Sequence, residues 1–314
     1  MAILLNNHGY DNASWQVALA ELLPEQQIYL FAEMTPARRQ QIEYALVWDH
    51  PPGDLAEYPN LKGIHLLGAG TEAVDADSTI PDVPVMRLVD PQVLEDMARY
   101  ALYWVLHFHR RFGDYAEQQE RAHWERHNLC ASEEFSVLVL GLGMVGKTVA
   151  KRLSENGYNV LGWDRNLTEL SGVECYSRNE LSPALFQADI VINCLPLTTA
   201  TRYMIDAELL AQLPKGAVLV NISRGELLVE ADVVEALETG HLSQVVLDAF
   251  SIEPLPADSP LWRHPDIHIT PHMSGATYAH SAAKLVVDNI QRIEQGERPF
   301  PLHSPNRFTN KNNT

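Results

Sequence analysis

The sequence has few cysteines and few basic residues, and each shortage excludes a class of protein. Its 314 residues include three cysteines, Cys130, Cys175 and Cys194, which follow no paired spacing and cannot all be joined in disulfides. This usage favours the reducing cytoplasm over a secreted, disulfide-rich protein. Lys and Arg number 23 against 41 Asp and Glu, which gives a formal net charge of −18. An acidic protein repels phosphate backbones and anionic lipid, so we expect neither nucleic acid nor a membrane as a partner.

Long apolar segments are also missing. No apolar run approaches the about 20 residues that a membrane-spanning helix needs. The N-terminus lacks the basic and apolar regions of a signal peptide. We therefore expect a cytoplasmic protein, and the length of the chain predicts two domains of ordinary size.

Short apolar runs alternate with helical patterns along almost the whole chain. The predicted strands cover residues 2–5, 45–48, 64–67, 136–140, 160–163, 190–193, 218–221, 245–247 and 267–269. Several are apolar throughout, which is typical of parallel strands covered by helices on both faces. The predicted class is α/β, with two Rossmann-like, doubly wound parallel-sheet domains and a cleft between them.

Helix ends can be recognised from capping residues. Asp90 followed by Pro91 is typical of a helix start and predicts a helix that continues to about Phe112. Its aromatic residues occupy more than one face, as expected of a helix that links two domains. Gly240 and Gly296 stand where glycine caps close two later helices.

The sharpest local feature is a G-x-G-x-x-G pattern that runs from Gly141 through Gly143, Met144 and Val145 to Gly146. It joins an apolar strand to a predicted helix. The first glycine permits a tight turn, the second lets a pyrophosphate approach the backbone, and the third allows close packing of helix on strand. The helix N-terminus offers free N–H groups to phosphate oxygens. The pattern in this context predicts dinucleotide binding.

An acidic residue follows the next predicted strand. Asp164 stands eighteen positions after Gly146, close to the spacing expected for a carboxylate that accepts the ribose hydroxyls. A carboxylate there repels a 2′-phosphate and favours NAD(H). Arg165, directly beside it, is able to pair with that phosphate, so NADP(H) stays open.

Three later segments each place polar residues directly after an apolar strand. They carry Arg224, Asp248 with Glu253, and His272. Ligands of open α/β sheets bind outside the carboxyl ends of the strands. We therefore expect these side chains to converge beside the cofactor.

The motifs together resemble the D-isomer-specific 2-hydroxyacid dehydrogenase family. They are the glycine turn with Asp164, Asn221-Ile222-Ser223-Arg224-Gly225, Leu247-Asp248-Ala249-Phe250 with Glu253-Pro254-Leu255-Pro256, and Thr270-Pro271-His272-Met273-Ser274-Gly275. The segments 193–198 and 67–70 also fit, and the resemblance extends over residues 46–301. The surroundings of Trp48 and Ser259-Pro260-Leu261-Trp262 are similar to the glyoxylate/hydroxypyruvate reductases within that family.

The resemblance implies roles for three catalytic residues. Arg224 would bind the carboxylate and carbonyl oxygen of the substrate, His272 would donate the proton, and Glu253 would hydrogen-bond the imidazole and keep it protonated. The chemistry agrees, because reduction of a 2-oxo acid needs a cation for the carboxylate and a proton donor for the developing alkoxide.

The resemblance also implies binding residues. For the cofactor these are the glycine turn, Asp164 and Arg165, together with Leu195, Pro196, Ile222, Ser223, Asp248, Ser274 and Gly275, where Asp248 would orient the nicotinamide amide. For the substrate they are Trp48, Gly68, Ala69 and Gly70 besides Arg224. The similar reductases usually lack an acid at position 164, so their cofactor preference cannot be transferred.

We accordingly expect a discontinuous substrate domain of residues 1–102 plus 290–314 and a dinucleotide-binding domain of residues 103–289. The predicted function is NAD(P)H-dependent reduction of a small 2-oxo acid, of the glyoxylate or hydroxypyruvate type, to the D-2-hydroxy acid. A dehydrogenase for a bulkier 2-hydroxy acid and a catalytically weak NAD(H)-sensing protein are the alternatives. The family suggests a homodimer. His264, His268 and His272 recur every four residues, but Pro265 and Pro271 interrupt any helix there, so we expect no metal.

Overall fold

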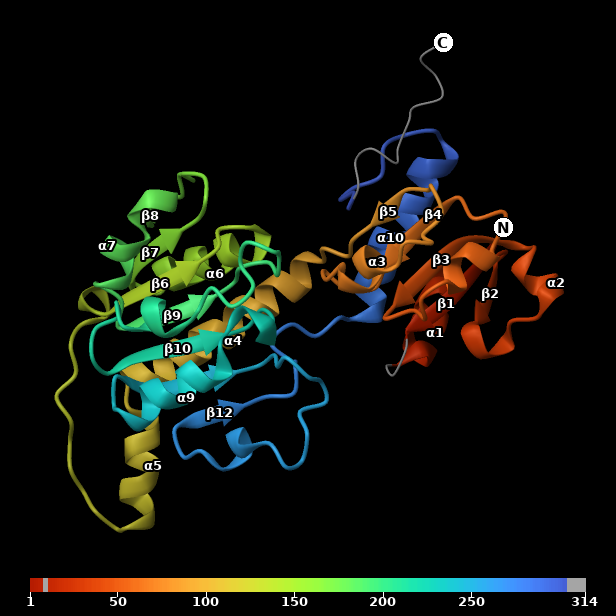
Figure 1. Cartoon of the computed structure of the whole chain (residues 1–314). Helices are drawn as coiled ribbons and strands as arrows, with labels where there is room; N and C mark the ends of the chain where they lie inside the picture. Colours follow the sequence, from red (N-terminus) through yellow and green to blue (C-terminus); the bar gives the residue numbers. More distant parts are fainter. Residues whose placement is uncertain (8–10, 304–314) are drawn as a thin grey trace. The chain divides into compact units, whose positions relative to one another are not determined.

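The computed structural model describes residues 1–7 and 11–303, and the chain divides into two compact units (Figure 1). Unit 1 comprises Met1–Val93 and Thr277–Thr314, and unit 2 comprises Leu94–Ala276. Each unit contains one sheet of parallel strands. The predicted α/β class is confirmed.

Unit 1 is built on a five-stranded sheet in the order β2-β1-β3-β4-β5. Its strands are β1 (Ala2–Asn7), β2 (Gln27–Leu30), β3 (Ile42–Trp48), β4 (Gly63–Leu66) and β5 (Val85–Met86), and its helices are α1 (Asn12–Leu22), α2 (Pro36–Arg39), α3 (Glu72–Ala76) and α10 (Ala279–Glu294). Alternate residues of a strand point to opposite faces. Ile3 and Leu5 therefore pack with α1 and α10, whereas Leu4 packs on the other face with Leu55.

Unit 2 is built on a seven-stranded sheet in the order β12-β11-β10-β9-β6-β7-β8. Its strands are β6 (Ser136–Leu140), β7 (Asn159–Trp163), β8 (Glu174–Tyr176), β9 (Ile190–Asn193), β10 (Ala217–Asn221), β11 (Leu242–Leu247) and β12 (Ile267–Ile269). Strand order reverses between β6 and β9, which is the point where open α/β sheets bind ligands.

Helices cover both faces of the unit 2 sheet. They are α6 (Met144–Glu155), α7 (Leu181–Leu185), α8 (Ala207–Leu210), α9 (Glu230–Glu238) and most of α4 (Pro91–His109). A further helix, α5 (Phe112–Glu120), has no buried residue. Val137 and Val139 pack with α4 and α6, whereas Leu138 and Leu140 pack with α7, α8 and α9. Short 3₁₀ turns complete the chain at Phe31–Glu33, Asp54–Glu57, Ser132–Glu134, Arg178–Glu180, Gly225–Leu227 and Pro260–Arg263.

All nine predicted strands are present, and residues 1–7 and 11–303 contain three further strands that were not predicted. The unpredicted strands β2, β5 and β8 each stand at an edge of a sheet. Their sequences are short or mix polar and apolar residues (QIYL, VM and ECY). A strand of only two to four residues, paired with a neighbour on one side only, carries too little apolar periodicity to be recognised.

The helix caps confirm most of the predicted helix ends. Asp90 Oδ1 accepts a hydrogen bond from the Gln92 N–H at 2.9 Å at the start of α4. Gly240 and Gly296 have the positive φ of glycine caps, 66° and 73°. The prediction that α4 reaches Phe112 is wrong. The helix ends at His109, because Arg111 adopts a left-handed conformation (φ 56°) and α5 begins at Phe112.

The unit boundaries lie earlier in the chain than the sequence suggests. They fall at residues 93/94 and 276/277 rather than at 102/103 and 289/290. Ala98 and Ala101 of α4 are already buried in the core of unit 2, and Ala282 and Val286 of α10 are buried in the core of unit 1. Residues 304–314, which the predicted substrate domain includes, lie outside the described part of the chain.

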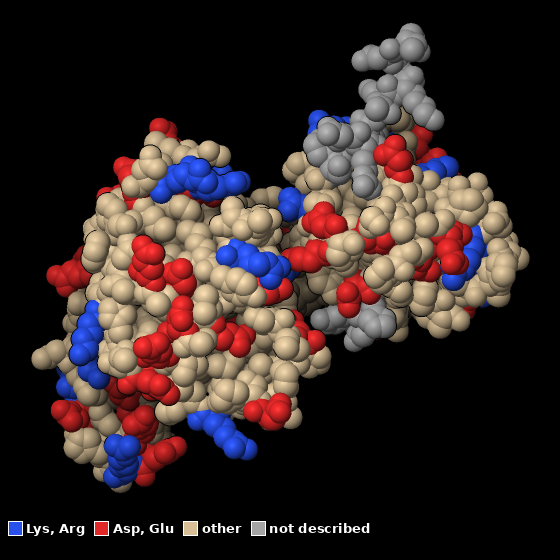
Figure 2. All heavy atoms as spheres, in the orientation of Figure 1, with Lys and Arg blue, Asp and Glu red and all other residues tan. Residues whose placement is uncertain are grey.

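Charge is spread over the surface rather than concentrated. Asp and Glu side chains are scattered across the visible face of each unit, with fewer Lys and Arg among them (Figure 2). Among residues 1–7 and 11–303, no helix combines the length and the apolar character that crossing a membrane requires.

Candidate active site

The glycine turn has the geometry that dinucleotide phosphates need. Gly141 follows β6 with φ +91°. A Cβ placed on Gly146 would lie 1.8 Å from the carbonyl oxygen of Gly141, so only glycine lets α6 pack this closely on the turn. A Cβ on Gly143 would meet nothing within 4 Å, which leaves open space above the backbone where α6 begins. The chain therefore fits a pyrophosphate at the N-terminus of α6.

Asp164 is held within this turn. Its Oδ2 accepts a hydrogen bond from the Leu142 N–H at 2.9 Å, and its Oδ1 accepts one from the Asn166 N–H at 3.4 Å. Arg165 is exposed beside it. The carboxylate thus links the end of β7 to the glycine turn.

Two buried asparagines, whose role was not predicted from the sequence, organise the carboxyl ends of β9 and β10. Asn193 Nδ2 donates to Asn221 Oδ1 at 2.9 Å, and both residues are 0% exposed. Asn193 Oδ1 accepts from the Leu195 N–H, and Asn221 Nδ2 donates to the carbonyl oxygen of Arg224. The pair therefore links the loop after β9 to the loop after β10. A polar residue at the end of an apolar strand was the signal that could have identified them.

The neighbouring predicted cofactor residues lie in the same loops. Ser223 Oγ donates to the carbonyl oxygen of Leu195, and the Ser223 N–H donates to Asn221 Oδ1 at 3.3 Å. Ile222 and Leu195 are buried, whereas Pro196 is exposed. Met144, at the first turn of α6, is 46% exposed.

Asp248 supports the loop that carries His272. Its carboxylate, 1% exposed, accepts hydrogen bonds from Thr270 Oγ1 at 2.6 Å and from the N–H groups of Met273 and Ser274, each at 2.9 Å. The His272 N–H donates to the backbone oxygen of Asp248 at 2.8 Å. These contacts hold His272 in a left-handed conformation (φ 51°) that an unsupported residue would avoid.

His272 and Glu253 form the predicted pair. His272 Nδ1 lies 2.8 Å from Glu253 Oε2, and Glu253 Oε1 accepts from the Phe250 N–H at 2.9 Å. The two side chains are 35% and 34% exposed. Burial opposes ionisation of Glu253, but its hydrogen bonds and the nearby positive charges of His272 and Arg224 lower its pKa below the usual range.

A close backbone approach brings Arg224 beside this pair. A Cβ on Gly225 would lie 2.0 Å from the carbonyl carbon of Phe250. Only glycine therefore lets the chain after β10 touch the chain after β11. The structure thus brings together Arg224, Glu253 and His272 at the carboxyl ends of β10, β11 and β12.

In unit 1, the predicted substrate residues also lie at the carboxyl ends of strands. Trp48 ends β3, and Gly68 follows β4. A Cβ on Gly68 would lie 2.3 Å from Trp48 Cζ3, so the indole packs directly on this glycine. Ala69 is exposed, and Gly70 is partly exposed.

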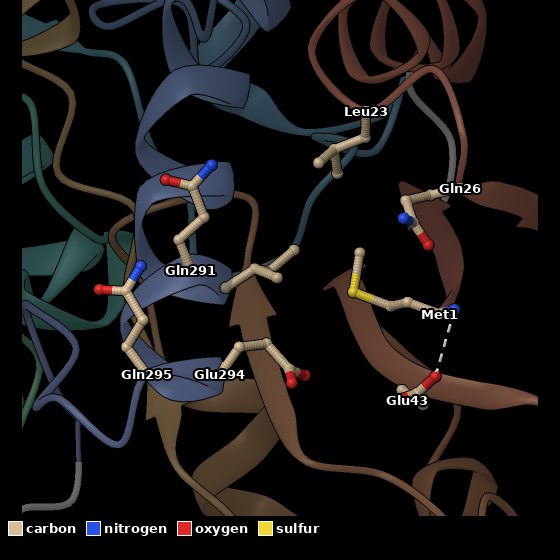
Figure 3. Close-up of a pocket in the computed structure, with 8 residues that line it drawn as sticks. Met1, Leu23, Gln26, Glu43, Gln291, Glu294 and Gln295 are labelled. Carbon is tan, nitrogen blue, oxygen red and sulfur yellow. Dashed lines mark ion pairs between the residues drawn. The ribbon is translucent and has the colours of Figure 1, made fainter.

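Two cavities lie elsewhere. One of about 470 Å³ in unit 1 is lined by Met1, Leu23, Gln26, Glu43, Ile290, Gln291, Glu294 and Gln295 (Figure 3). Another of about 450 Å³ in unit 2 lies near Ala217, Gln244 and Asp266. Both are at the amino ends of strands, opposite to the ends where the sheets carry the predicted site residues. Within the described ranges, no three His, Cys, Asp or Glu side chains are arranged to hold a metal ion.

Comparison with known proteins gives the family. A family model described as "D-isomer specific 2-hydroxyacid dehydrogenase, NAD binding domain" matches residues 102–274. A curated relative, glyoxylate/hydroxypyruvate reductase A of Serratia proteamaculans (strain 568), is 36% identical over 300 residues, which cover 93% of this chain and 95% of the relative.

Solved structures agree over nearly the full length. A D-isomer specific 2-hydroxyacid dehydrogenase from Xanthobacter autotrophicus Py2, in complex with NADPH and MES, has a TM-score of 0.91 at 36% identity and covers 98% of this chain and 99% of its own. An NADPH-dependent glyoxylate/hydroxypyruvate reductase from Sinorhizobium meliloti, in complex with NADP and sulfate, has a TM-score of 0.91 at 28% identity and covers 98% and 100%. The chain therefore belongs to the D-isomer specific 2-hydroxyacid dehydrogenase family, and it is an NAD(P)-dependent oxidoreductase of 2-hydroxy and 2-oxo acids.

Proposed function

We propose that this enzyme reduces a small 2-oxo acid, of the glyoxylate or hydroxypyruvate type, to the D-2-hydroxy acid. The observation that carries the proposal is the 2.8 Å contact between His272 Nδ1 and Glu253 Oε2, with Arg224 close enough to influence the same carboxylate. The curated relative is named for glyoxylate and hydroxypyruvate, which supports this substrate class.

The proposed chemistry assigns one task to each residue. Bound NAD(P)H supplies the hydride. Arg224 binds the substrate carboxylate and stabilises the charge that develops on the carbonyl oxygen. Glu253 accepts a hydrogen bond from the Nδ1–H of His272, which fixes the ring. The proton on Nε2 then points away from Glu253 and is donated to the substrate oxygen.

We assign the binding residues as the family resemblance implies. The cofactor contacts the glycine turn and the loops after β7, β9, β10, β11 and β12, including Asp248 and Ser274. Trp48 contacts the substrate, and the backbone N–H groups of Ala69 and Gly70 hold its carboxylate. We propose that two copies of the chain form a homodimer.

We propose that Asp164 makes NAD(H) the favoured cofactor. Its carboxylate is fixed within the glycine turn, where its negative charge opposes a 2′-phosphate. The relatives from Xanthobacter autotrophicus and Sinorhizobium meliloti, by comparison, were solved with NADPH and NADP. A higher efficiency with NADPH that is lost in Arg165→Ala would assign recognition of the 2′-phosphate to Arg165 and overturn the proposal.

A turnover assay tests the function. The loss of reduced-nicotinamide absorbance is followed with glyoxylate, hydroxypyruvate and larger 2-oxo acids, using NADH and NADPH in parallel. We expect turnover of the small acids and a large loss of kcat/KM in Arg224→Ala and His272→Ala. Activity of either variant within a few-fold of the wild type would refute the roles. Preference for a larger acid would favour the bulkier substrate, and tight NADH binding without turnover would favour a sensor.

A further inference from the structure

A buried pair of His50 and Asp77 in unit 1 connects the two loops proposed to bind substrate. His50 Nε2 lies 3.3 Å from Asp77 Oδ2, and the side chains are 1% and 2% exposed. His50 belongs to the loop after β3, two residues beyond Trp48. Asp77 follows α3, which begins two residues after Gly70. Neither side chain is exposed enough to touch a substrate.

The Asp77 carboxylate accepts several hydrogen bonds from the loop after β3 and from Thr79. Besides His50, its Oδ2 accepts a hydrogen bond from the Gly53 N–H at 2.9 Å. Its Oδ1 accepts from the N–H and the hydroxyl of Thr79, at 2.9 and 2.6 Å. Burial opposes ionisation, but these hydrogen bonds and the one with His50 hold the pKa of Asp77 well below its usual range. Since an ionised carboxylate only accepts hydrogen bonds, His50 Nε2 must carry a hydrogen and donate it.

The loop after β3 has a conformation that needs such an anchor. Asp49, between Trp48 and His50, has φ 51°, and Gly53 has φ 85°. The left-handed region is unfavourable for a residue with a Cβ and persists only where the surroundings enforce it. The hydrogen bonds from His50 and from Gly53 hold this loop, and both are accepted by the Asp77 carboxylate.

The loops also touch directly at the substrate end. The Trp48 indole packs on Gly68, at the start of the loop that leads to Ala69 and Gly70. The loop after β3 and the segment from Gly68 to Asp77 are therefore in contact at two points. Trp48 packs on Gly68 at one point, and His50 contacts Asp77 at the other. Movement of His50 would shift Trp48 against the glycine loop.

The pair is costly to maintain. His50 Nδ1 is buried and finds no hydrogen-bond partner among residues 1–7 and 11–303. A buried polar atom without a partner lowers stability, and an apolar residue of similar size would avoid that cost. The hydrogen bond from His50 to Asp77 therefore orders the two loops at a cost in stability.

We propose that His50 and Asp77 are positioning residues that set Trp48 and the Gly68–Gly70 loop in the geometry that binds the substrate carboxylate. The proposal rests on the proposed function in one respect, namely that these two loops contact the substrate.

The test compares three variants of the full-length enzyme. His50→Leu removes the hydrogen bond to Asp77, and we expect KM for the 2-oxo acid to rise at least about tenfold, the equivalent of one lost hydrogen bond to a charged group. We expect kcat and the dissociation constant of NAD(P)H to stay near the wild type. His50→Gln places an amide N–H near the position of Nε2 and should restore KM. Tyr44→Phe is the control, since it removes a hydrogen bond to Glu294 at the other end of β3 and should leave KM unchanged.

A second readout separates this proposal from the proposed function. Amide hydrogen exchange of residues 48–54 and 66–79 should accelerate in His50→Leu and not in Tyr44→Phe, whether or not a 2-oxo acid is turned over. Unchanged exchange in folded His50→Leu, or an unchanged KM in an active enzyme, would overturn the positioning role. If wild-type enzyme turns over no 2-oxo acid while exchange accelerates as expected, the proposed function fails and the positioning role stands. If His50→Leu does not fold, Asp77→Asn replaces it. In that variant an NH₂ group faces the N–H donors of His50 and Gly53 and cannot accept their hydrogen bonds.

Discussion

Asp248→Asn is the most informative single substitution. Asparagine has almost the same shape as aspartate, but the substitution removes hydrogen-bond acceptors from a buried site. The asparagine amide has one oxygen. If that oxygen stays toward Thr270 and Met273, the new NH₂ group faces the N–H of Ser274, which donates at 2.9 Å in the native protein. In the reverse orientation the NH₂ group faces the N–H of Met273, and the Thr270 hydroxyl has to accept instead of donate. Either orientation therefore loses one hydrogen bond and sets two donors against each other.

The expected size of the effect follows from this count. A hydrogen bond to a charged group contributes about 1.5–3 kcal/mol, so a loss of about 2 kcal/mol should lower Tm by about 4–8 °C in a unit of this size. The catalytic effect should be larger, because the same loop carries His272. A displacement of about 1 Å costs up to about 10²-fold in rate, so we expect kcat to fall by about that factor.

The assay is kcat at saturating cofactor and 2-oxo acid, together with a thermal melt followed by circular dichroism. Asp189→Asn is the matched control. Its carboxylate accepts a hydrogen bond from the Ser136 N–H at 2.8 Å at the amino end of β6, whereas the His272 loop follows the carboxyl end of β12. Wild-type kcat and Tm in Asp248→Asn would show that the loop is held by other contacts, and equal losses in both variants would show a general effect of the substitution.

Four further substitutions test separate parts of the structure. Gly143→Ala should keep the wild-type Tm and weaken NAD(P)H binding at least about tenfold, measured by fluorescence titration, whereas Gly146→Ala should lower the free energy of unfolding by about 1–3 kcal/mol or more. Because the pKa of Glu253 is lowered by folding, its contribution to stability is present above the pKa of the unfolded chain and lost as pH falls. Glu253→Gln should therefore flatten the loss of stability between about pH 5 and 3 in urea titrations. Gly68→Ala should displace Trp48 and raise KM for the 2-oxo acid without changing NAD(P)H affinity; an unchanged KM would contradict the assigned substrate contact.

The central strands could be predicted because each carries its own signal. β6, β9 and β10 are apolar except for Ser136, Asn193 and Asn221 at their ends, and such apolar runs are typical of parallel strands covered on both faces. The edge strands β2, β5 and β8 depend on a neighbour for their conformation. Nothing in the local pattern distinguishes them from loops. The end of α4 at His109 is a similar case, since Arg111 is no typical breaker and its left-handed conformation depends on surrounding contacts.

The candidate site divides in the same way. The glycine turn is a local motif that can be recognised from the spacing of its three glycines. Gly146 meets Gly141 within the turn, whereas the contact of Gly141 with Cys194, after β9, forms only in the sheet. Arg224, Glu253 and His272 were recognised from motif order. The contacts that hold them were not predictable, because Gly225 meets Phe250 and Asn193 meets Asn221 only after the sheet has formed. The pair of His50 and Asp77 joins residues of two loops and has no sequence signature.

The order of folding during synthesis follows from the discontinuity of unit 1. Ile3 and Leu19 from the start of the chain share a core with Val286 and Ile290 of α10, so unit 1 cannot complete its interior until α10 has been made. At about 5–20 residues per second, the roughly 200 intervening residues take about 10–40 s to synthesise. Unit 2 is continuous and is complete once residue 276 has emerged. Unit 2, although translated after the first segment of unit 1, therefore folds first. Until α10 has been made, the apolar face of β1 and α1 stays exposed to solvent, and chaperones or transient collapse must keep it from aggregating.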